Sequence, residues 1–244
     1  MKKQAKLTSS QIRRLCAISL FAAMAYVAVL LFRIKVQFLT FDIKDVFLGI
    51  CALVYGPLAG AVCAVTVALI EMITVSDTMF YGFIMNILSS CAFICPAAII
   101  YNTKRNLKRA GIGVGVSVVF MTVVMLLANV IVTPLYQGMP VSAILPLLPT
   151  LILPFNFTKA LANGALIFFL YEPVTRAMKR VGLIQKSKNQ ELPPSTVEQN
   201  GREVSSAQSR RKTTVSVLVL SLLVLSLALA CFFVLLEGKI ILFR

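Results

Sequence analysis

The sequence predicts an all-α polytopic membrane protein, a bundle of six helices followed by an additional C-terminal transmembrane helix. Three observations predict it. The 244 residues are 59% hydrophobic and only 14% charged, with a mean hydropathy of +0.89. Apolar residues gather in long runs, and basic residues cluster between these runs. This composition is typical of chains that cross a bilayer several times.

Apolar runs define the expected spans, because about 20 apolar residues cross a bilayer as a helix. In chain order the runs are residues 15–32, 46–55, 58–73, 80–101, 112–132, 152–171 and 215–236. The first run is too long for a removed signal peptide, and no small-residue cleavage site follows it.

Residues 46–73 form either one helix kinked at Gly56-Pro57 or two helices that turn there. The basic residues favour the turn, because it places residues 1–14, 102–111 and 172–214 on one side of the membrane, and these segments hold most of the Lys and Arg. The positive-inside rule makes that side cytoplasmic. We therefore expect a multi-pass protein of the cell membrane with a cytoplasmic N-terminus and an extracellular C-terminus. Its short second helix needs neighbouring protein to cover its ends.

Composition divides the chain into three parts. Residues 1–183 contain the six-helix membrane domain. Residues 184–212 are rich in Ser, Gln, Asn, Glu and Lys and predict a flexible cytoplasmic linker. Residues 213–244 contain the additional transmembrane helix and a short tail.

The composition also argues against several functions. The net charge is +15, but no aromatic patch suited to base stacking accompanies the basic residues, so we expect no nucleic-acid partner. The chain has no histidine, which removes the commonest general base and zinc ligand. The six cysteines lie in apolar runs without a Cys-x-x-Cys pair and are expected to pack as small hydrophobes. We expect no enzyme, no metal site and no cofactor.

Lys159 is the most informative residue, because it lies inside the apolar run 152–171. A lysine at mid-bilayer costs about 3 kcal/mol, so its default interpretation is functional. Asn156 precedes it by three residues on the same helical face, and Pro154 marks the start of that helix. The pair predicts a ligand site near one membrane surface. The structural alternative is that Lys159 reaches the surface or pairs with Glu71.

Other polar residues fall on the same outer side. Asn129 lies near the outer end of the fifth span, and it could contact the same ligand or bond between helices. Glu71 ends the third span, where it could bind a proton or a cation, and Asp42 and Asp45 lie in the first outer loop. Together these residues predict one outward-facing pocket between helices.

The first outer loop, residues 37–45, alternates polar and apolar residues. We expect it to cap the pocket, with Phe38, Leu39 and Phe41 over a flat ligand and Thr40 offering its hydroxyl or backbone. On the first helix, Ser19 and Ala23 form a small-x-x-x-small ridge that permits close approach of another helix.

With these residues in place, the chain resembles the substrate-binding S components of energy-coupling factor (ECF) vitamin transporters over about residues 12–183. The stretches that carry the resemblance are Asp-Ile-Lys-Asp-Val at 42–46, Tyr-Gly-Pro-Leu-Ala-Gly at 55–60, Gly-Phe-Ile-Met-Asn at 82–86, Asn129 with Thr-Pro-Leu-Tyr at 133–136, and Leu-Pro-Phe-Asn-Phe-Thr-Lys at 153–159. The last two are most similar to the riboflavin-specific member.

The resemblance implies a substrate-capture subunit that binds riboflavin at the extracellular face. It implies a transmembrane coupling subunit and two ATPase subunits as partners that drive uptake, in keeping with the absence of a phosphate-binding loop here. Ser19 and Ala23 align with the Ala-x-x-x-Ala motif that docks the coupling subunit. The residues implied to bind the ligand are Asn129, Asn156, Lys159, Leu39, Thr40 and Ser76.

Alternative functions stay open at this point. The same class of protein could bind another vitamin, such as pantothenate or thiamine. A stand-alone secondary carrier could use Glu71 and Lys159 as an ion-coupled pair. An intramembrane enzyme is disfavoured, because the chain has no histidine and no Gly-x-Ser-x-Gly motif.

Overall fold

The structure is a computed structural model that describes residues 8–183, 219, 222–224, 226 and 240–241. The elements in order are α1 (Ser9–Leu31), β1 (Ile34–Val36), β2 (Leu39–Phe41), α2 (Lys44–Tyr55), α3 (Pro57–Thr74), α4 (Met79–Thr103), α5 (Leu107–Gln137), α6 (Val141–Ile144), the π-helix η1 (Leu148–Ile152), α7 (Leu153–Arg180) and β3 (Ile240–Ile241). Five of the described helices, counting η1 with α7, are long and apolar enough to cross a membrane. This confirms the predicted class of an all-α polytopic membrane protein. The expected linker 184–212 and most of the expected last helix 215–236 lie outside the described residues.

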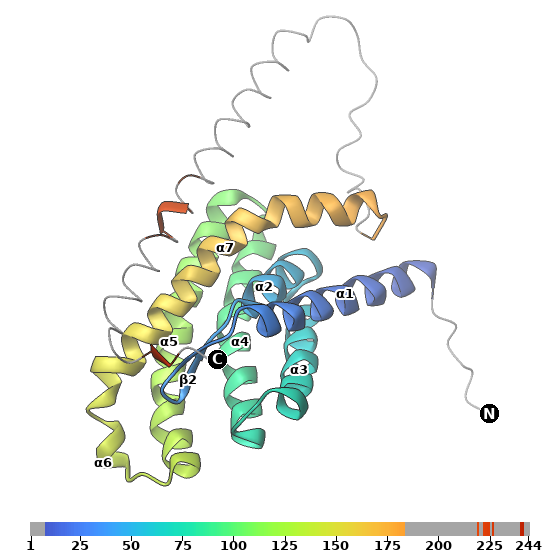
Figure 1. The fold of residues 1–244 in the computed structure, drawn as a ribbon. Helices are drawn as coiled ribbons and strands as arrows, with labels where there is room; N and C mark the ends of the chain where they lie inside the picture. Colours follow the sequence, from blue (N-terminus) through green and yellow to red (C-terminus); the bar gives the residue numbers. More distant parts are fainter. Residues whose placement is uncertain (1–7, 184–218, 220–221, 225, 227–239, 242–244) are drawn as a thin grey trace, which may run out of the picture.

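The short helix α2 occupies the middle of the bundle. It packs against α1, α3, α4 and α7 (Figure 1). Its residues from Lys44 to Leu53 are buried except Phe47. Neighbouring helices therefore cover a helix of only 12 residues, as a piece too short to span alone requires.

The predicted turn between the second and third helices, α2 and α3, is present. Gly56 lies between α2 and α3 at φ 97°, a conformation that glycine adopts without steric cost. Pro57 then begins α3, where the missing N–H has no helical partner to lose. The two residues thus reverse the chain in a single tight turn.

Two helices continue through a proline beyond the C-terminal ends of their apolar runs. Helix α5 extends through Pro134 to Gln137, so the stretch Thr-Pro-Leu-Tyr at residues 133–136 is part of the helix. The last described long helix extends to Arg180 through Pro173. In Figure 1, α7 changes direction in this C-terminal part. A proline removes one backbone donor from the helix interior and commonly bends it there.

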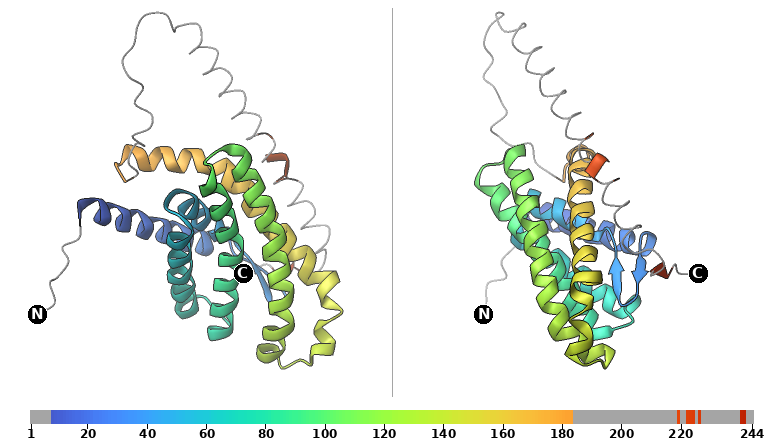
Figure 2. Two further views of the ribbon diagram at one scale, coloured as in Figure 1. Left: turned by 180° about the vertical axis from the view of Figure 1, so that it is seen from behind. Right: turned by 90° about the vertical axis from the view of Figure 1, so that its left-hand side faces the viewer.

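The first outer loop is a β-hairpin, which the sequence did not predict. β1 pairs antiparallel with β2, with Lys35 opposite Thr40, and β3 pairs with the other edge of β1. The hairpin lies beside the N-terminal half of α7 (Figure 2). Val36, Leu39 and Phe41 of the hairpin pack in a second apolar core with Ile152 and Phe155. This core seats the hairpin on the bundle.

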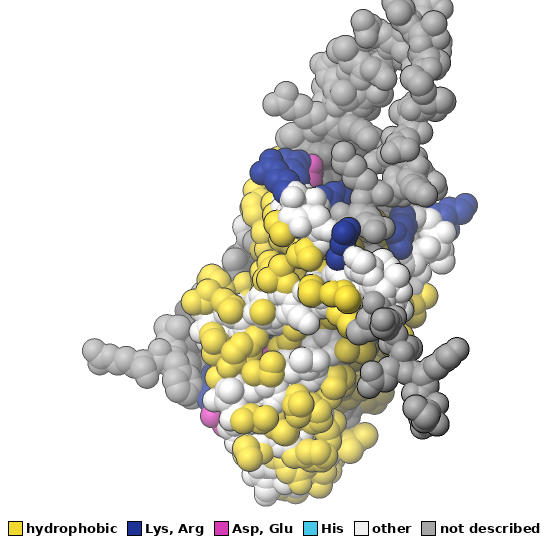
Figure 3. Space-filling view, turned by 90° about the vertical axis from the view of Figure 1, so that its right-hand side faces the viewer, with side chains coloured by type: hydrophobic (Ala, Val, Ile, Leu, Met, Phe, Trp, Pro, Cys, Tyr) yellow, Lys and Arg dark blue, Asp and Glu magenta, His cyan; other side chains and the backbone are white. Residues whose placement is uncertain are grey.

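Basic side chains gather at the end of the molecule that carries the α4–α5 connection and the C-terminal part of α7 (Figure 3). The hairpin and the α3–α4 connection lie toward the opposite end (Figure 1). The basic segments that were used to predict the topology therefore lie together at one end of the folded molecule.

Candidate functional site

A cavity of about 240 Å³ lies between the hairpin, the α3–α4 connection, α4, α5 and α7. All six residues expected at the ligand site line it: Leu39, Thr40, Ser76, Asn129, Asn156 and Lys159. Four separate parts of the chain thus place their predicted residues around one space. The role of these residues in binding stays a prediction, but their convergence is a structural fact.

Lys159 is buried, with 5% of its surface exposed. Its ammonium nitrogen lies 2.8 Å from Oδ2 of Asp42 and donates to the backbone oxygen of Thr40 at 3.1 Å. The lysine therefore neither reaches the surface nor pairs with Glu71, the two structural alternatives considered from the sequence. It links α7 to the connection after β2.

Glu71 is buried and has its own partners. Lys44 donates to both of its carboxylate oxygens, at 2.9 and 2.7 Å, and the amide of Asn86 donates to Oε2 at 2.7 Å. Lys44 also lies 3.9 Å from Asp42. Glu71 and Lys159 thus belong to different ion pairs, so the structure does not contain the ion-coupled pair that the carrier hypothesis assumed.

Asp42 and Asp45 were expected in an outer loop, but both are buried. Asp45 lies in the first turn of α2, where its Oδ1 accepts a hydrogen bond from Ser90 at 2.5 Å. The expected second span began at residue 46, whereas α2 begins at Lys44. The central position of α2 explains the difference, because its first turn is enclosed by neighbouring helices.

The two lysines decide the ionisation of Asp42. Burial alone would raise the pKa of this carboxyl, but the positive charges of Lys159 and Lys44 outweigh burial and hold the pKa below its ordinary value of 3.8. Asp42 is therefore a carboxylate at neutral pH, and Lys159 has a charged partner.

Asn129 and Asn156 are buried on α5 and α7. The amide of Asn156 donates to the backbone oxygen of Ile152 at 2.8 Å. The amide of Asn129 donates to the oxygen of Met125 at 2.7 Å, and its Oδ1 accepts from Thr133 at 2.8 Å. Each asparagine side chain forms hydrogen bonds within its own helix. Asn129 therefore does not form the hydrogen bond between helices that was considered as its structural role.

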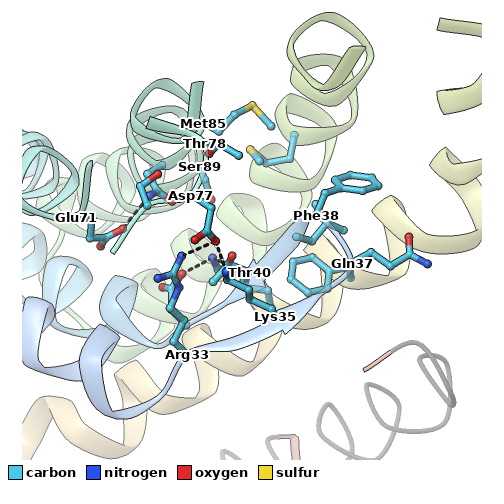
Figure 4. A pocket seen from close by; sticks show the side chains of 18 of the residues that line it. Arg33, Lys35, Gln37, Phe38, Thr40, Glu71, Asp77, Thr78, Met85 and Ser89 are labelled. Atoms are coloured by element: carbon cyan, nitrogen blue, oxygen red, sulfur yellow. Dashed lines mark hydrogen bonds and ion pairs between the residues drawn. The ribbon is translucent and has the colours of Figure 1, made fainter. Parts of the chain in front are cut away.

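The mouth of the cavity carries an ionic contact that the sequence analysis missed. Lys35 of β1 pairs with Asp77 of the α3–α4 connection, and a guanidinium nitrogen of Arg33 lies 3.9 Å from the same carboxylate (Figure 4). Arg33 also donates to the backbone oxygen of Val75. These contacts tie the hairpin to the opposite rim of the cavity.

Apolar and aromatic side chains form much of the remaining wall. They come from the hairpin, α4, α5 and α7: Phe38, Met85, Met125, Tyr136 and Phe155. Only Phe38 was expected from the sequence. Tyr136 lies seven residues after Asn129, two helical turns along the same face of α5, and this spacing is a signal that could have indicated it. Within the described residues, no three His, Cys, Asp or Glu side chains gather to hold a metal ion.

Ser19 and Ala23 lie on α1, away from the cavity. Both are exposed, whereas Ala17, Phe21 and Ala25 on the other face of the same helix are buried in the core. The small-residue ridge is therefore available to a neighbour in the membrane.

The fold is that of a polytopic membrane protein with a cavity between its helices and beneath a β-hairpin. Residues 13–175 match the family described as ECF transporter, substrate-specific component. The chain belongs to this family, whose members bind the substrate of a transporter and are not enzymes.

Two curated relatives and one solved structure are similar to the chain. The riboflavin transporter RibU of Staphylococcus aureus is 29% identical over 193 residues, which cover 74% of this chain and 100% of the relative. The riboflavin transporter FmnP of Bacillus subtilis is 29% identical over 178 residues, covering 67% of this chain and 94% of the relative. A structure described as the S component of a bacterial ECF transporter superposes with a TM-score of 0.59 at 28% identity, covering 70% of this chain and 99% of the other.

Proposed function

We propose that this chain captures riboflavin at the extracellular face and that partner subunits drive its uptake with ATP. The observation that carries the proposal is the convergence of Asn129, Asn156 and Lys159 with Leu39 and Thr40 of the hairpin around one cavity. The similarity to two proteins named riboflavin transporters supports the choice of vitamin.

The lining suits a flat heteroaromatic ring that carries a polar chain. Phe38, Phe155 and Tyr136 offer apolar and aromatic surface, while amide and ammonium groups offer hydrogen bonds at a few defined places. Small-molecule sites combine these two properties. A ring carbonyl or a ribityl hydroxyl that accepts from Lys159 would take the place of the backbone oxygen of Thr40.

Ligand entry requires the hairpin to move. The cavity of about 240 Å³ is slightly below the roughly 300–1,000 Å³ that is common for small-molecule sites. Residues 37–40 line it from the hairpin side, so a small outward movement of β1 and β2 enlarges it. The contacts of Lys35 and Arg33 with the α3–α4 connection open in that movement.

The basic end of the molecule supports the proposed orientation. Lys and Arg of the α4–α5 connection and of the C-terminal part of α7 gather there (Figure 3). The positive-inside rule places such an end in the cytoplasm, which leaves the hairpin and the cavity outside. The exposed ridge of Ser19 and Ala23 is our proposed contact with a transmembrane coupling subunit, which two ATPase subunits would power.

Titration of the purified chain with several vitamins tests the substrate. We expect riboflavin to raise the melting temperature in detergent and to saturate at one molecule per chain, with no comparable effect of pantothenate or thiamine. A larger stabilisation by either of those vitamins would move the proposal to another substrate of the same class.

An uptake assay in vesicles distinguishes the proposed capture subunit from a stand-alone carrier. We expect riboflavin uptake only when the coupling subunit, the ATPase subunits and ATP are all present. Uptake by the chain alone, driven by an ion gradient, would overturn the proposed role as a capture subunit.

A further inference from the structure

The molecule has a second cavity, of about 290 Å³, near the basic end and away from the hairpin. It lies between the α4–α5 connection, the start of α5 and the C-terminal half of α7. None of the residues around the first cavity lines it. The proposed function therefore leaves it without a role.

Its walls are mostly apolar. Leu53 of α2 and Ile167 of α7 are buried and also line the cavity, so the space reaches into the bundle. Leu107, Ala110 and Phe168 complete the apolar wall. Leu107 is 45% exposed, so this wall continues onto the outer surface of the bundle. A cavity of this kind accepts hydrocarbon.

The polar groups stand at one side. Arg105 and Glu172 line the cavity from the α4–α5 connection and from α7, so its rim offers one cation and one carboxylate. Glu172 also accepts from Arg176, its neighbour one turn later on α7. A carboxylate has room for a further donor besides Arg176, because its two oxygens offer about four acceptor positions.

Two tyrosines add a hydrogen-bond donor. The hydroxyls of Tyr101 and Tyr171 lie 3.3 Å apart, and both residues line the cavity. The bond between them uses one of their two protons. Within the described residues neither hydroxyl has a second hydrogen-bond partner, so one proton is left to donate to an oxygen.

We propose that this cavity binds one glycerophospholipid with an amine-bearing headgroup. Its phosphate contacts Arg105, its amine contacts Glu172, an ester oxygen accepts from the tyrosine pair, and the upper part of one acyl chain lies against Leu107, Ala110 and Phe168. The proposal combines charge complementarity at the rim with hydrocarbon complementarity along the wall. It is independent of which solute the first cavity takes.

The dimensions favour a lipid over a protein partner. A stable protein interface buries about 800 Å² on each side, which needs a broad surface. This cavity holds about 290 Å³, reaches the buried Leu53 and Ile167, and has Arg105 of the basic end in its lining, at the level where a membrane-embedded bundle meets the headgroups. A volume of this size takes part of one acyl chain, and it is too small to take a docked helix.

Native mass spectrometry of the full chain in detergent tests the proposal. Delipidated protein is mixed with phosphatidylethanolamine or with phosphatidylglycerol, and lipid retained per chain is counted. We expect wild type to retain one phosphatidylethanolamine. Arg105→Gln should bind it roughly tenfold more weakly, since a hydrogen bond to a charged group is lost. Ala110→Met, which fills the cavity, should lose it as well.

Two further variants complete the test, the first as a charge control and the second as a test of the amine contact. Lys108→Gln removes an equal charge from the start of α5, at a position outside the cavity lining, and should retain the lipid. Glu172→Gln should remove the preference for phosphatidylethanolamine over phosphatidylglycerol. The melting temperature of each variant shows that the bundle is folded.

Three results would overturn the proposal. One is that wild type retains no lipid at a ratio of one per chain. Another is that Lys108→Gln weakens binding as much as Arg105→Gln, which means a diffuse surface charge effect. The third is that Arg105→Gln retains the lipid as well as wild type does, which means that Arg105 does not contact the phosphate.

Discussion

The ammonium group of Lys159 lies 2.8 Å from Oδ2 of Asp42, a residue 117 positions earlier in the chain. Both side chains are buried, and both line the cavity beneath the hairpin. The pair therefore connects α7 to the base of the hairpin. It also compensates a lysine charge that could not otherwise be held inside a membrane-embedded bundle.

Replacing Asp42 alone should destabilise the ligand-free protein. Asp42→Asn leaves Lys159 buried without its carboxylate, and breaking a buried pair in this way costs about 3–5 kcal/mol. Asp42→Asn combined with Lys159→Met removes both charges and should recover most of the loss. Thermal unfolding in detergent measures both effects. A double variant no more stable than Asp42→Asn would show that the pair does not carry this stability.

The contact between Lys35 and Asp77 should slow the release of riboflavin. It joins β1 to the α3–α4 connection at the cavity mouth, but Asp77 is 64% exposed, so water screens the interaction. An exposed ion pair contributes about 0.2–1 kcal/mol, so Lys35→Gln should raise the dissociation rate by roughly 1.4- to 5-fold. Stopped-flow flavin fluorescence measures that rate.

A matched control uses the opposite end of the molecule. Lys104→Gln removes the same charge far from the cavity and should leave the dissociation rate unchanged. Raising the salt concentration should speed release from wild type more than from Lys35→Gln, in which only Arg33 still lies near Asp77. Equal salt dependence in both proteins would mean that the ion pair does not hold the hairpin.

Gly113 permits close contact between α4 and α5. A Cβ added at this position would lie 2.8 Å from the backbone oxygen of Ala97, and neither backbone can move aside cheaply. Gly113→Ala should therefore lower stability by about 1–3 kcal/mol. Gly115, two residues later, has nothing within 4 Å of the corresponding position. Gly115→Ala should leave the melting temperature unchanged or raise it, and an equal loss in both variants would contradict the packing argument.

Cysteine accessibility tests the proposed orientation. In a background without native cysteines, Met139→Cys at the cavity end should react with a membrane-impermeant thiol reagent on intact cells. Lys108→Cys at the basic end should react only after the membrane is permeabilised. The reverse pattern would place the cavity in the cytoplasm and exclude capture of an external solute.

Helical spacing correctly predicted that two polar side chains of α7 lie on one face. Asn156 and Lys159 are three residues apart after Pro154, and the structure places both around one cavity. The short second helix and its turn at Gly56 were also predicted, because the charge on the flanking loops favoured the turn over a single kinked helix.

The partner of Lys159 could not be predicted in the same way. Asp42 reaches it across the fold, and its position depends on the hairpin register that pairs Lys35 with Thr40. Nothing in residues 37–45 alone shows that a polar segment turns inward. The sequence suggested Glu71 as the acidic partner of Lys159. In the structure Lys44 is buried at the start of α2 and forms the ion pair with Glu71 instead.

Fluorescence titration of riboflavin into the purified chain tests the central claim most directly. We predict saturable quenching of flavin fluorescence at one molecule per chain for wild type and for Asn102→Ala, an amide variant outside the cavity lining. Asn156→Ala combined with Lys159→Ala should show no high-affinity quenching while its helical circular dichroism is retained. Unchanged flavin affinity in that double variant, or no saturable quenching by wild type, would contradict the assignment of this cavity to riboflavin.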